Sequence, residues 1–162
     1  MSVTGSGGGK ALNVVAPTDA LEGKTTMTML DSGRAMMSAY LDAIGAGAKG
    51  QFAEYFTDDV VMQVVGTDQE VRGRQAVEGT IRYLQQQAFD GRPDIKSVLV
   101  DGDQAVLEAD FVARHIGEFA GKAPTGREVR VPCTIVYDLA DNHIKALRIY
   151  GFMDALLRQL EG

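Results

Sequence analysis

Apolar side chains recur at helical spacing in two stretches of the first half of the chain, and each stretch predicts a long helix. The first helix starts at Asp31 or Ser32, either of which is a good N-cap, and ends near Ile44. The second helix runs from Gln75 to about Phe89. The apolar positions are Met37, Tyr40, Leu41 and Ile44 in the first helix and Val77, Ile81, Leu84 and Ala88 in the second.

From residue 95 onward the apolar period changes to two, which is typical of strands. Turn residues at 101–103 and 140–142 divide this half into strands that pair as hairpins. The run Asp90-Gly91-Arg92-Pro93 predicts that the second helix stops there. The expected strands cover residues 60–65, 95–100, 105–116, 127–138 and 143–152, and short helices cover 51–56 and 154–160.

Helices first and strands later indicate an α+β fold with a largely antiparallel sheet. A strongly bent sheet wrapped over the long helices forms a cone with a cavity at its wide end. Residues 1–28 are rich in Gly and Thr, and they carry little apolar surface that could offset the entropy lost on ordering. We therefore expect a flexible extension over residues 1–28 and one folded domain over residues 29–162.

Composition and charge narrow the function classes. The chain has 162 residues with 16 Lys and Arg against 22 Asp and Glu, a net charge of −6. Binding to nucleic acid or to an anionic membrane favours a basic surface, so we expect neither partner. Cys133 is the single cysteine and there are two histidines, which excludes an internal disulfide, a four-thiolate zinc site and a three-histidine metal site. The chain has no transmembrane-length apolar run and no signal-peptide pattern, so we expect a soluble, cytoplasmic protein.

Four short motifs carry a family resemblance. They are an acidic turn and strand at 55–61, an R-G-R helix start at 71–77, an H-x-G-E-F … P-T-G-R pair at 115–127, and an apolar tail at 156–160. In this order they resemble the SnoaL-like polyketide cyclases of the nuclear-transport-factor-two-like superfamily, over residues 35–162. The resemblance implies a cone-shaped α+β barrel of the cystatin-like type, with helices packed in a bent sheet.

The resemblance also implies acid–base chemistry without a cofactor or metal, carried by a carboxylate in or just after the last strand. Counted without gaps, the cyclase position falls on Phe152 and the epoxide-hydrolase position on Ile149, and neither side chain transfers protons. A slip of two residues, which a β-bulge absorbs, places Asp154 at the acidic position instead. Asp154 is also a good N-cap for the final helix.

Further catalytic candidates lie in the last strand and in the strand 105–116. Tyr150 and Arg148 are expected to polarise a substrate oxygen. In the strand 105–116, alternation places apolar residues and His115 on one face and charged residues, including Asp110, on the other. Pattern alone buries the first face and puts His115 near the cavity mouth. The resemblance to epoxide hydrolases instead turns the charged face, with Asp110, toward the pocket.

The expected cavity is mostly apolar, with few groups that can form hydrogen bonds. Such a wall suits a flat, apolar or aromatic ligand. The expected substrate-binding residues are Tyr40, Met62, Gln63, Val64, Phe111, Ile135, Tyr137, Ile149 and Phe152.

Three functions follow from these observations. The first is a cofactor-free enzyme that cyclises, isomerises or dehydrates an apolar carbonyl compound, with Asp154 as acid or base and Asp110 and His115 as reserves. The second is a non-catalytic member that binds a hydrophobic small molecule or a protein, as the apolar residues at Ile149 and Phe152 indicate. The third is an epoxide hydrolase, which requires Asp110 to face inward. Because members of this superfamily commonly pair through the open sheet face, we also expect a homodimer.

Overall fold

The computed structural model describes residues 20–161, and it describes side chains from residue 31 onward. In chain order the elements are α1 (Ala20–Gly45), the 3₁₀ helix η1 (Ala53–Tyr55), β1 (Phe56–Val64), β2 (Glu70–Arg72), α2 (Arg74–Arg82), the π-helical turn η2 (Tyr83–Ala88), β3 (Phe89–Asp101), β4 (Gln104–His115), β5 (Glu128–Ala140), β6 (His143–Tyr150) and α3 (Met153–Glu161).

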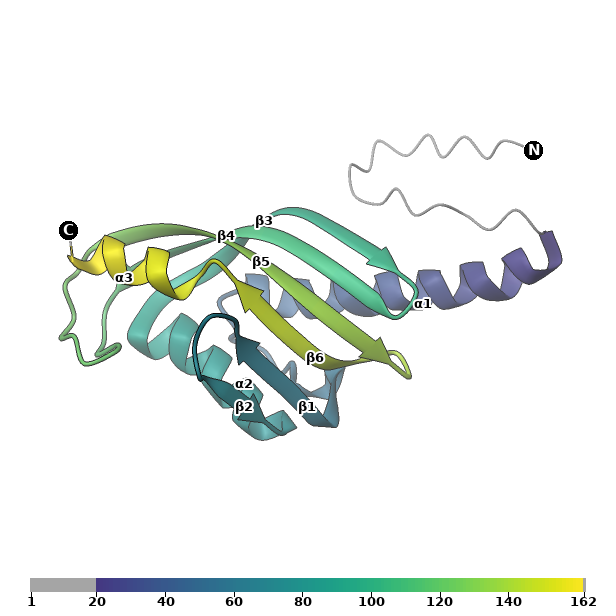
Figure 1. Cartoon of the computed structure of the whole chain (residues 1–162), viewed down its shortest axis with the longest axis horizontal. Coiled ribbons are helices and arrows are strands. Elements are labelled where there is room, and N and C mark those ends of the chain that lie inside the picture. The colour runs from purple at the N-terminus through teal and green to yellow at the C-terminus, as the bar shows by residue number, and fades with distance from the viewer. Residues whose placement is uncertain (1–19, 162) are drawn as a thin grey trace.

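The six strands form one mixed sheet in the order β2-β1-β6-β5-β4-β3 (Figure 1). Neighbouring strands are antiparallel except β1 and β6, which run parallel. Within residues 20–161 the edge strands β2 and β3 do not pair with each other, so the bent sheet stays open and does not close into a barrel. The predicted α+β class and the mainly antiparallel sheet are confirmed.

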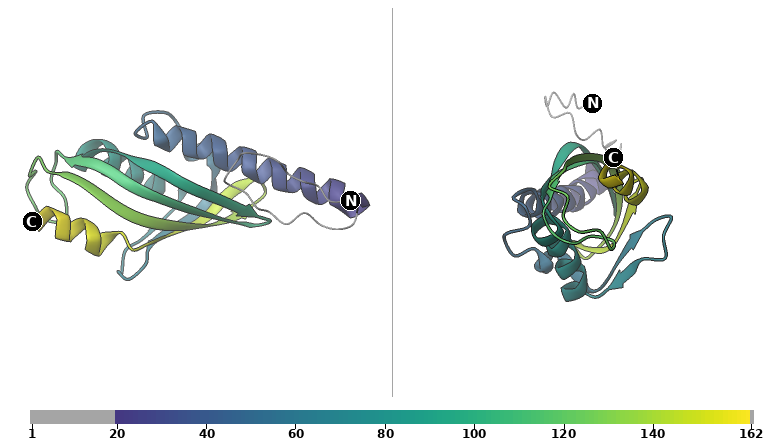
Figure 2. Two further views of the ribbon diagram at one scale, coloured as in Figure 1. Left: turned by 90° about the horizontal axis from the view of Figure 1, so that it is seen from above. Right: turned by 90° about the vertical axis from the view of Figure 1, so that its left-hand side faces the viewer.

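The sheet curves around the helices, and its concave face carries the core (Figure 2). α1 lies along this face, and the four apolar positions predicted for it are all buried. In the second predicted helix, Val77, Ile81 and Ala88 are buried and Leu84 is half-buried. Helical spacing in the sequence therefore identified the faces of both helices that pack on the sheet.

α1 begins at Ala20, well before the N-cap predicted at Asp31 or Ser32. The prediction took Gly23 and the threonines before residue 29 as a break. One Gly costs only about 1 kcal/mol in a helix, whereas each residue added to an existing helix gains a backbone hydrogen bond. Residues 1–19 of the predicted extension lie outside the described residues.

The run Asp90–Pro93 does not end a helix, as predicted, but lies inside the strand β3. β3 is an edge strand, where a proline is tolerated because one side of the strand needs no ladder hydrogen bond. Gly91 serves packing across the sheet: a Cβ atom at this position would lie 2.8 Å from Cζ of Phe111. The ring of Phe111 on β4 therefore occupies the space that a side chain at position 91 of β3 would fill.

The turn η2 is fixed by the loop that follows β4. The N–H groups of Ile116 and Gly117 both donate to the carbonyl oxygen of Ala88, at 2.9 and 3.0 Å. Gly117 lies so close to η2 that an added Cβ would be 2.2 Å from the carbonyl oxygen of Gln87. The glycine of the H-x-G-E-F motif is thus required by this backbone contact.

We expect Gly117→Ala to destabilise the protein by about 1–3 kcal/mol, because the new methyl group must push the loop away from η2. Urea unfolding followed by circular dichroism measures the change. The matched control is Gly79→Ala in α2, where no atom lies within 4 Å of the added Cβ. That substitution is expected to stabilise the helix by up to about 1 kcal/mol. Equal stability of the wild type and Gly117→Ala would contradict the account.

Charged side chains gather on the convex face of the sheet. Asp110 on β4 is only 4% exposed, and Arg130 binds one of its carboxylate oxygens at 2.7 Å while Lys96 binds the other at 3.1 Å. Arg130 also reaches Asp94 at 3.2 Å. The hydrogen bond from Arg130, followed by that from Lys96, lowers the pKa of Asp110. The charged face of β4 therefore lies outside the core, as alternation alone predicts.

This lowered pKa predicts a pH dependence of stability. A carboxylate whose pKa is lower in the folded state stabilises the fold above its unfolded value of about 3.9 and loses that effect as pH falls through the folded value. We expect Asp110→Asn to be less stable than the wild type at pH 7, and the difference to shrink below about pH 4. Urea unfolding at a series of pH values measures this difference, with the half-exposed Asp94→Asn as control. If the difference in unfolding free energy between wild type and Asp110→Asn stayed constant down to pH 2, the ionised carboxylate would not be what stabilises the fold.

Candidate functional site

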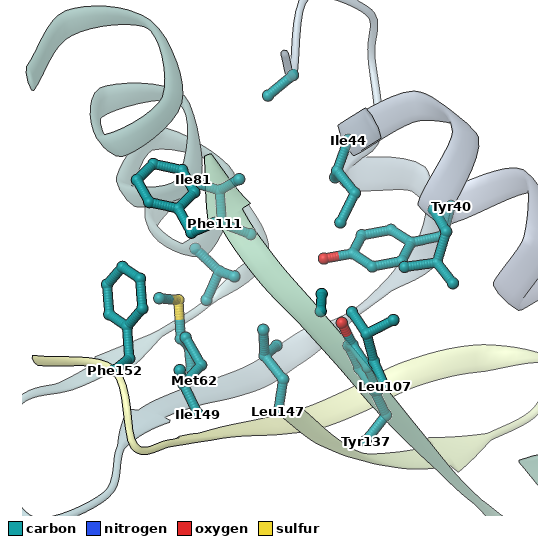
Figure 3. Close-up of a cluster of buried hydrophobic side chains, with 14 of the residues drawn as sticks. Tyr40, Ile44, Met62, Ile81, Leu107, Phe111, Tyr137, Leu147, Ile149 and Phe152 are labelled. Atoms are coloured by element: carbon teal, nitrogen blue, oxygen red, sulfur yellow. The ribbon is translucent and has the colours of Figure 1, made fainter. Parts of the chain in front are cut away.

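A small cavity lies between the helices and the concave face of the sheet. Its volume is about 70 Å³. The wall comes from α1, β1, α2, η2, the four strands β3 to β6, and the residue before α3 (Figure 3). The lining residues are Tyr40, Ile44, Met62, Ile81, Leu84, Gln85, Pro93, Leu107, Ala109, Phe111, Cys133, Ile135, Leu147, Ile149 and Phe152.

Only three of the lining side chains carry polar atoms: Tyr40, Gln85 and Cys133. The Tyr40 hydroxyl points toward the middle of the cluster in Figure 3. Burial raises the pKa of Tyr40 and, with Asp110 nearby, raises the pKa of Cys133 to about 11. Both groups are therefore neutral at pH 7, so the cavity wall offers dipoles rather than charges.

Aromatic rings hold the two ends of this cavity. Tyr40 makes edge contacts with Phe56 and with Tyr137, at centroid distances of 5.6 and 5.9 Å. At the other end, Phe111 meets Phe152 edge-on at 5.6 Å. Such contacts add to the packing energy of the buried rings and restrict their orientation. The aromatic part of the wall is thus a fixed feature of the fold.

The structure brings six of the nine expected substrate-binding residues to the cavity wall: Tyr40, Met62, Phe111, Ile135, Ile149 and Phe152. Val64 and Tyr137 are buried in the same core but do not line the cavity. Gln63 is exposed, because it alternates with Met62 and therefore points to the other face of β1.

The expected catalytic residues of the last strand lie outside the cavity. Arg148 and Tyr150 alternate with the lining residues of β6, and Arg148 forms a two-fold hydrogen bond with Asp138 at 2.7 and 3.0 Å. Tyr150 is 40% exposed. Asp154 is also exposed, in the first turn of α3.

Asp154 does not occupy the N-cap position either. α3 begins at Met153, and the carbonyl oxygen of Phe152 accepts the hydrogen bond from the N–H of Leu156. The carboxylate therefore lies one residue inside the helix, where its negative charge still interacts favourably with the positive end of the helix dipole. Phe152 and Ile149 line the cavity instead. These are the two positions at which the family resemblance, counted without gaps, implies an acidic residue.

Asp110 points away from the cavity, since its neighbours Ala109 and Phe111 line it. The condition set for the epoxide-hydrolase alternative, an inward Asp110, is therefore absent. His115 is on the concave face but lies at the far end of β4 and does not line the cavity.

His115 is fully buried and held by the loop that follows β4. Its Nδ1 atom accepts a hydrogen bond from the N–H of Thr125 at 3.1 Å, so in the neutral ring the proton is on Nε2. Within the described residues Nε2 has no hydrogen-bond partner, and the ring stacks on Phe89 at 5.0 Å. The residue thus joins the H-x-G-E-F and P-T-G-R motifs structurally.

A second, wider hollow lies at the β3 edge of the sheet near the end of α1, and outward-facing side chains of the sheet line part of it. Its volume is about 730 Å³, and side chains of both charges line it, including Arg92, Arg114, Arg130, Asp90 and Glu128. Arg114 and Glu128 neutralise each other at 3.1 Å. The homodimer expected through this face of the sheet stays a prediction.

Two kinds of feature are absent from residues 20–161. This part of the chain contains no cluster of three or more His, Cys, Asp or Glu side chains arranged to hold a metal ion. Among its helices, none combines the length and the apolar character that a membrane span requires.

Sequence reasoning missed Gln85, a buried polar side chain of the cavity wall. It follows Ile81 by four residues, which places it on the buried stripe of the second predicted helix. Gln85 was left out of the predicted stripe because only apolar residues were assigned to it. Pro93 was missed for a different reason, since it belonged to a predicted turn.

Known structures share this fold. A protein named as a SnoaL-like polyketide cyclase from Jannaschia sp. CCS1 superimposes with a TM-score of 0.73 at 22% identity, covering 83% of this chain and 94% of that chain. AclR from Streptomyces galilaeus, named as a hydroxylase, gives a TM-score of 0.68 at 22% identity, with 82% and 97% covered. An epoxide hydrolase of the LEH-like type from M. tuberculosis gives 0.61 at 19% identity, with 82% and 94% covered. At these identities the similarity establishes the fold alone.

No curated protein matches the sequence significantly. The sequence profile of the SnoaL-like domain matches residues 37–147, which is more than half of the chain and includes every strand of the sheet up to the middle of β6. Fold, motif order and profile agree, and the chain therefore belongs to the family of SnoaL-like domains.

Proposed function

We propose that this protein binds a small, mainly apolar molecule in the cavity between its helices and sheet. One observation carries the proposal: in the described structure the cavity wall holds no carboxylate, imidazole or basic group. Its polar atoms belong to neutral groups, which orient a ligand by hydrogen bonds. Apolar contact then supplies most of the binding energy, at about 25 cal/mol per Å² of surface removed from water.

The size of the cavity limits the ligand. Pockets for drug-sized ligands usually measure about 300–1,000 Å³, and dry apolar cavities of about 150 Å³ take up benzene. The present cavity of about 70 Å³ is smaller, so a ring-sized ligand has to displace side chains of the wall. Met62 lines the cavity and is the side chain best suited to move, because its unbranched chain adopts many shapes at low cost.

The alternative is the acid–base enzyme expected from the family resemblance. Cyclisation or isomerisation needs a group in the cavity that accepts and returns a proton. Asp154 reaches the interior only if the first turn of α3 unwinds, since its side chain is exposed in that helix. The names of the structural neighbours, a cyclase, a hydroxylase and an epoxide hydrolase, describe different reactions and favour no single one.

Toluene is a suitable probe for the proposed cavity. We expect it to bind to the wild type, to bind at least about tenfold more weakly to Ala109→Leu, and to bind more tightly to Met62→Ala. Ala109 is 2% exposed and lines the cavity, so leucine at this position fills it, whereas removal of the Met62 side chain widens it. Isothermal titration calorimetry measures the affinities.

The control is Val106→Leu, which places a leucine on the opposite face of β4, although it adds one carbon atom where Ala109→Leu adds three. It is expected to leave toluene binding unchanged. Loss of binding in both leucine variants, or in neither, would show that the probe binds elsewhere.

We further expect Asp154→Asn to leave toluene binding unchanged and to reduce stability by no more than about 1 kcal/mol, the usual effect of a charge near a helix N-terminus. The same calorimetric titration and a urea unfolding curve test this. A large loss of affinity in Asp154→Asn would place the carboxylate in the cavity of the ligand-bound protein and would favour the enzyme over the binding protein.

A further inference from the structure

We infer that the ligand carries a hydroxyl group, of the phenol type, that donates a hydrogen bond to the side-chain amide of Gln85. This inference rests on the proposed function and names the chemical class of the ligand. The observation behind it is a buried amide oxygen without a donor, on a residue that lines the cavity.

Gln85 is only 7% exposed, and its side chain lines the cavity. Within the described residues its Oε1 atom is fully buried and has no hydrogen-bond partner. The next two glutamines of η2 behave differently: Gln86 donates to the carbonyl oxygen of Ala48, and Gln87 is exposed. A buried amide oxygen without a donor destabilises a fold, because it gives up its hydrogen bond to water.

The backbone keeps Gln85 in this position. η2 is a π-helical turn, a rare conformation that is frequent at functional sites. The loop after α1 holds one side of it, since Arg82 donates to the carbonyl oxygen of Ala48 at 2.7 Å, as Gln86 also does. The loop after β4 holds the other end at Ala88. These contacts hold the backbone of η2 in place, and with it the position from which the Gln85 side chain lines the cavity.

The surroundings of Gln85 specify the rest of the ligand. Apart from Tyr40 and Cys133, the other lining residues are apolar. Burial raises the pKa of both Tyr40 and Cys133, so both side chains are neutral at pH 7. A hydroxyl on an aromatic ring fits both features, since the O–H meets the amide oxygen and the ring meets Phe111 and Phe152. A charged amine is a worse match, because no carboxylate lines the cavity to compensate for its desolvation.

Phenol and toluene test this directly, because they have the same size and differ in a hydroxyl against a methyl group. We expect wild-type protein to bind phenol at least as tightly as toluene. In Gln85→Leu, the ratio of the two affinities is expected to shift by about tenfold in favour of toluene. The thermal midpoint of the free Gln85→Leu protein is expected to rise, since the unpaired amide is replaced by an apolar side chain.

Gln86→Leu is the matched control on the same turn. It loses the bond to Ala48, so its thermal midpoint is expected to fall while the phenol-to-toluene ratio stays as in the wild type. Gln85→Met provides a second apolar replacement of similar length. Repeating both titrations in Met62→Ala, which widens the cavity without touching η2, strengthens the binding of both probes.

The outcomes separate the inference from the proposed function. If toluene binds but the ratio is the same in wild type, Gln85→Leu and Gln85→Met, the amide does not recognise the ligand and the inference fails, while the proposed function stands. A fall in the thermal midpoint of both Gln85 variants would show that the amide is bonded within the protein, which also overturns it. If neither probe binds to wild type or Met62→Ala, the proposed function fails as well.

Discussion

Side chains alternate between the two faces of a bent sheet, and this constraint decides which chemistry the interior of the protein can hold. Along β4, Ala109 and Phe111 face the cavity, so Asp110 between them must face outward. Along β6, Ile149 faces the cavity, which places Arg148 and Tyr150 on the other side. A register change by one residue would exchange the two sets completely, and the burial of the apolar set prevents it.

The charged groups on the convex face are therefore paired with each other. Asp110 is enclosed by Arg130 and Lys96, and Asp138 is bound by Arg148, which lowers the pKa of both carboxylates. These pairs stabilise the ionised acids and make them poor proton donors or acceptors near neutral pH. On the concave face there are no such ion pairs: the side chains that line the cavity are apolar or neutral. The fold thus separates the ion pairs from the apolar cavity by the thickness of one sheet.

Much of this arrangement could be predicted from the sequence, where local physics and tertiary packing agree. The apolar stripe of α1 and the alternation of β4 both appear in the structure, and the turn at Asp141 and Asn142 has two residues with positive φ, as tight hairpins require. The start of β3 at Phe89 could not be predicted, since Gly91 and Pro93 normally end helices. Gly91 is explained by its packing against Phe111, and Pro93 by the position of β3 at the edge of the sheet. Gln85 has the spacing of the apolar stripe, but its polar side chain is equally typical of a solvated face, so spacing alone did not single it out.

The apolar wall of the cavity was predicted in outline, whereas the placement of the polar side chains around it was not. Most of the apolar wall could be located because alternation fixes it, whereas the place of the acid depended on a register that the sequence leaves open. In the structure Ile149 and Phe152 point into the cavity, whereas Asp154 lies in the first turn of α3.

A crystal soaked with bromobenzene tests the central claim, that the space between helices and sheet is a ligand site, because the anomalous scattering of bromine locates the ring without bias. We expect a bromine peak enclosed by Met62, Phe111 and Phe152, with the side chain of Met62 displaced. A bromine peak confined to the outer surface, with an unchanged interior, would contradict it.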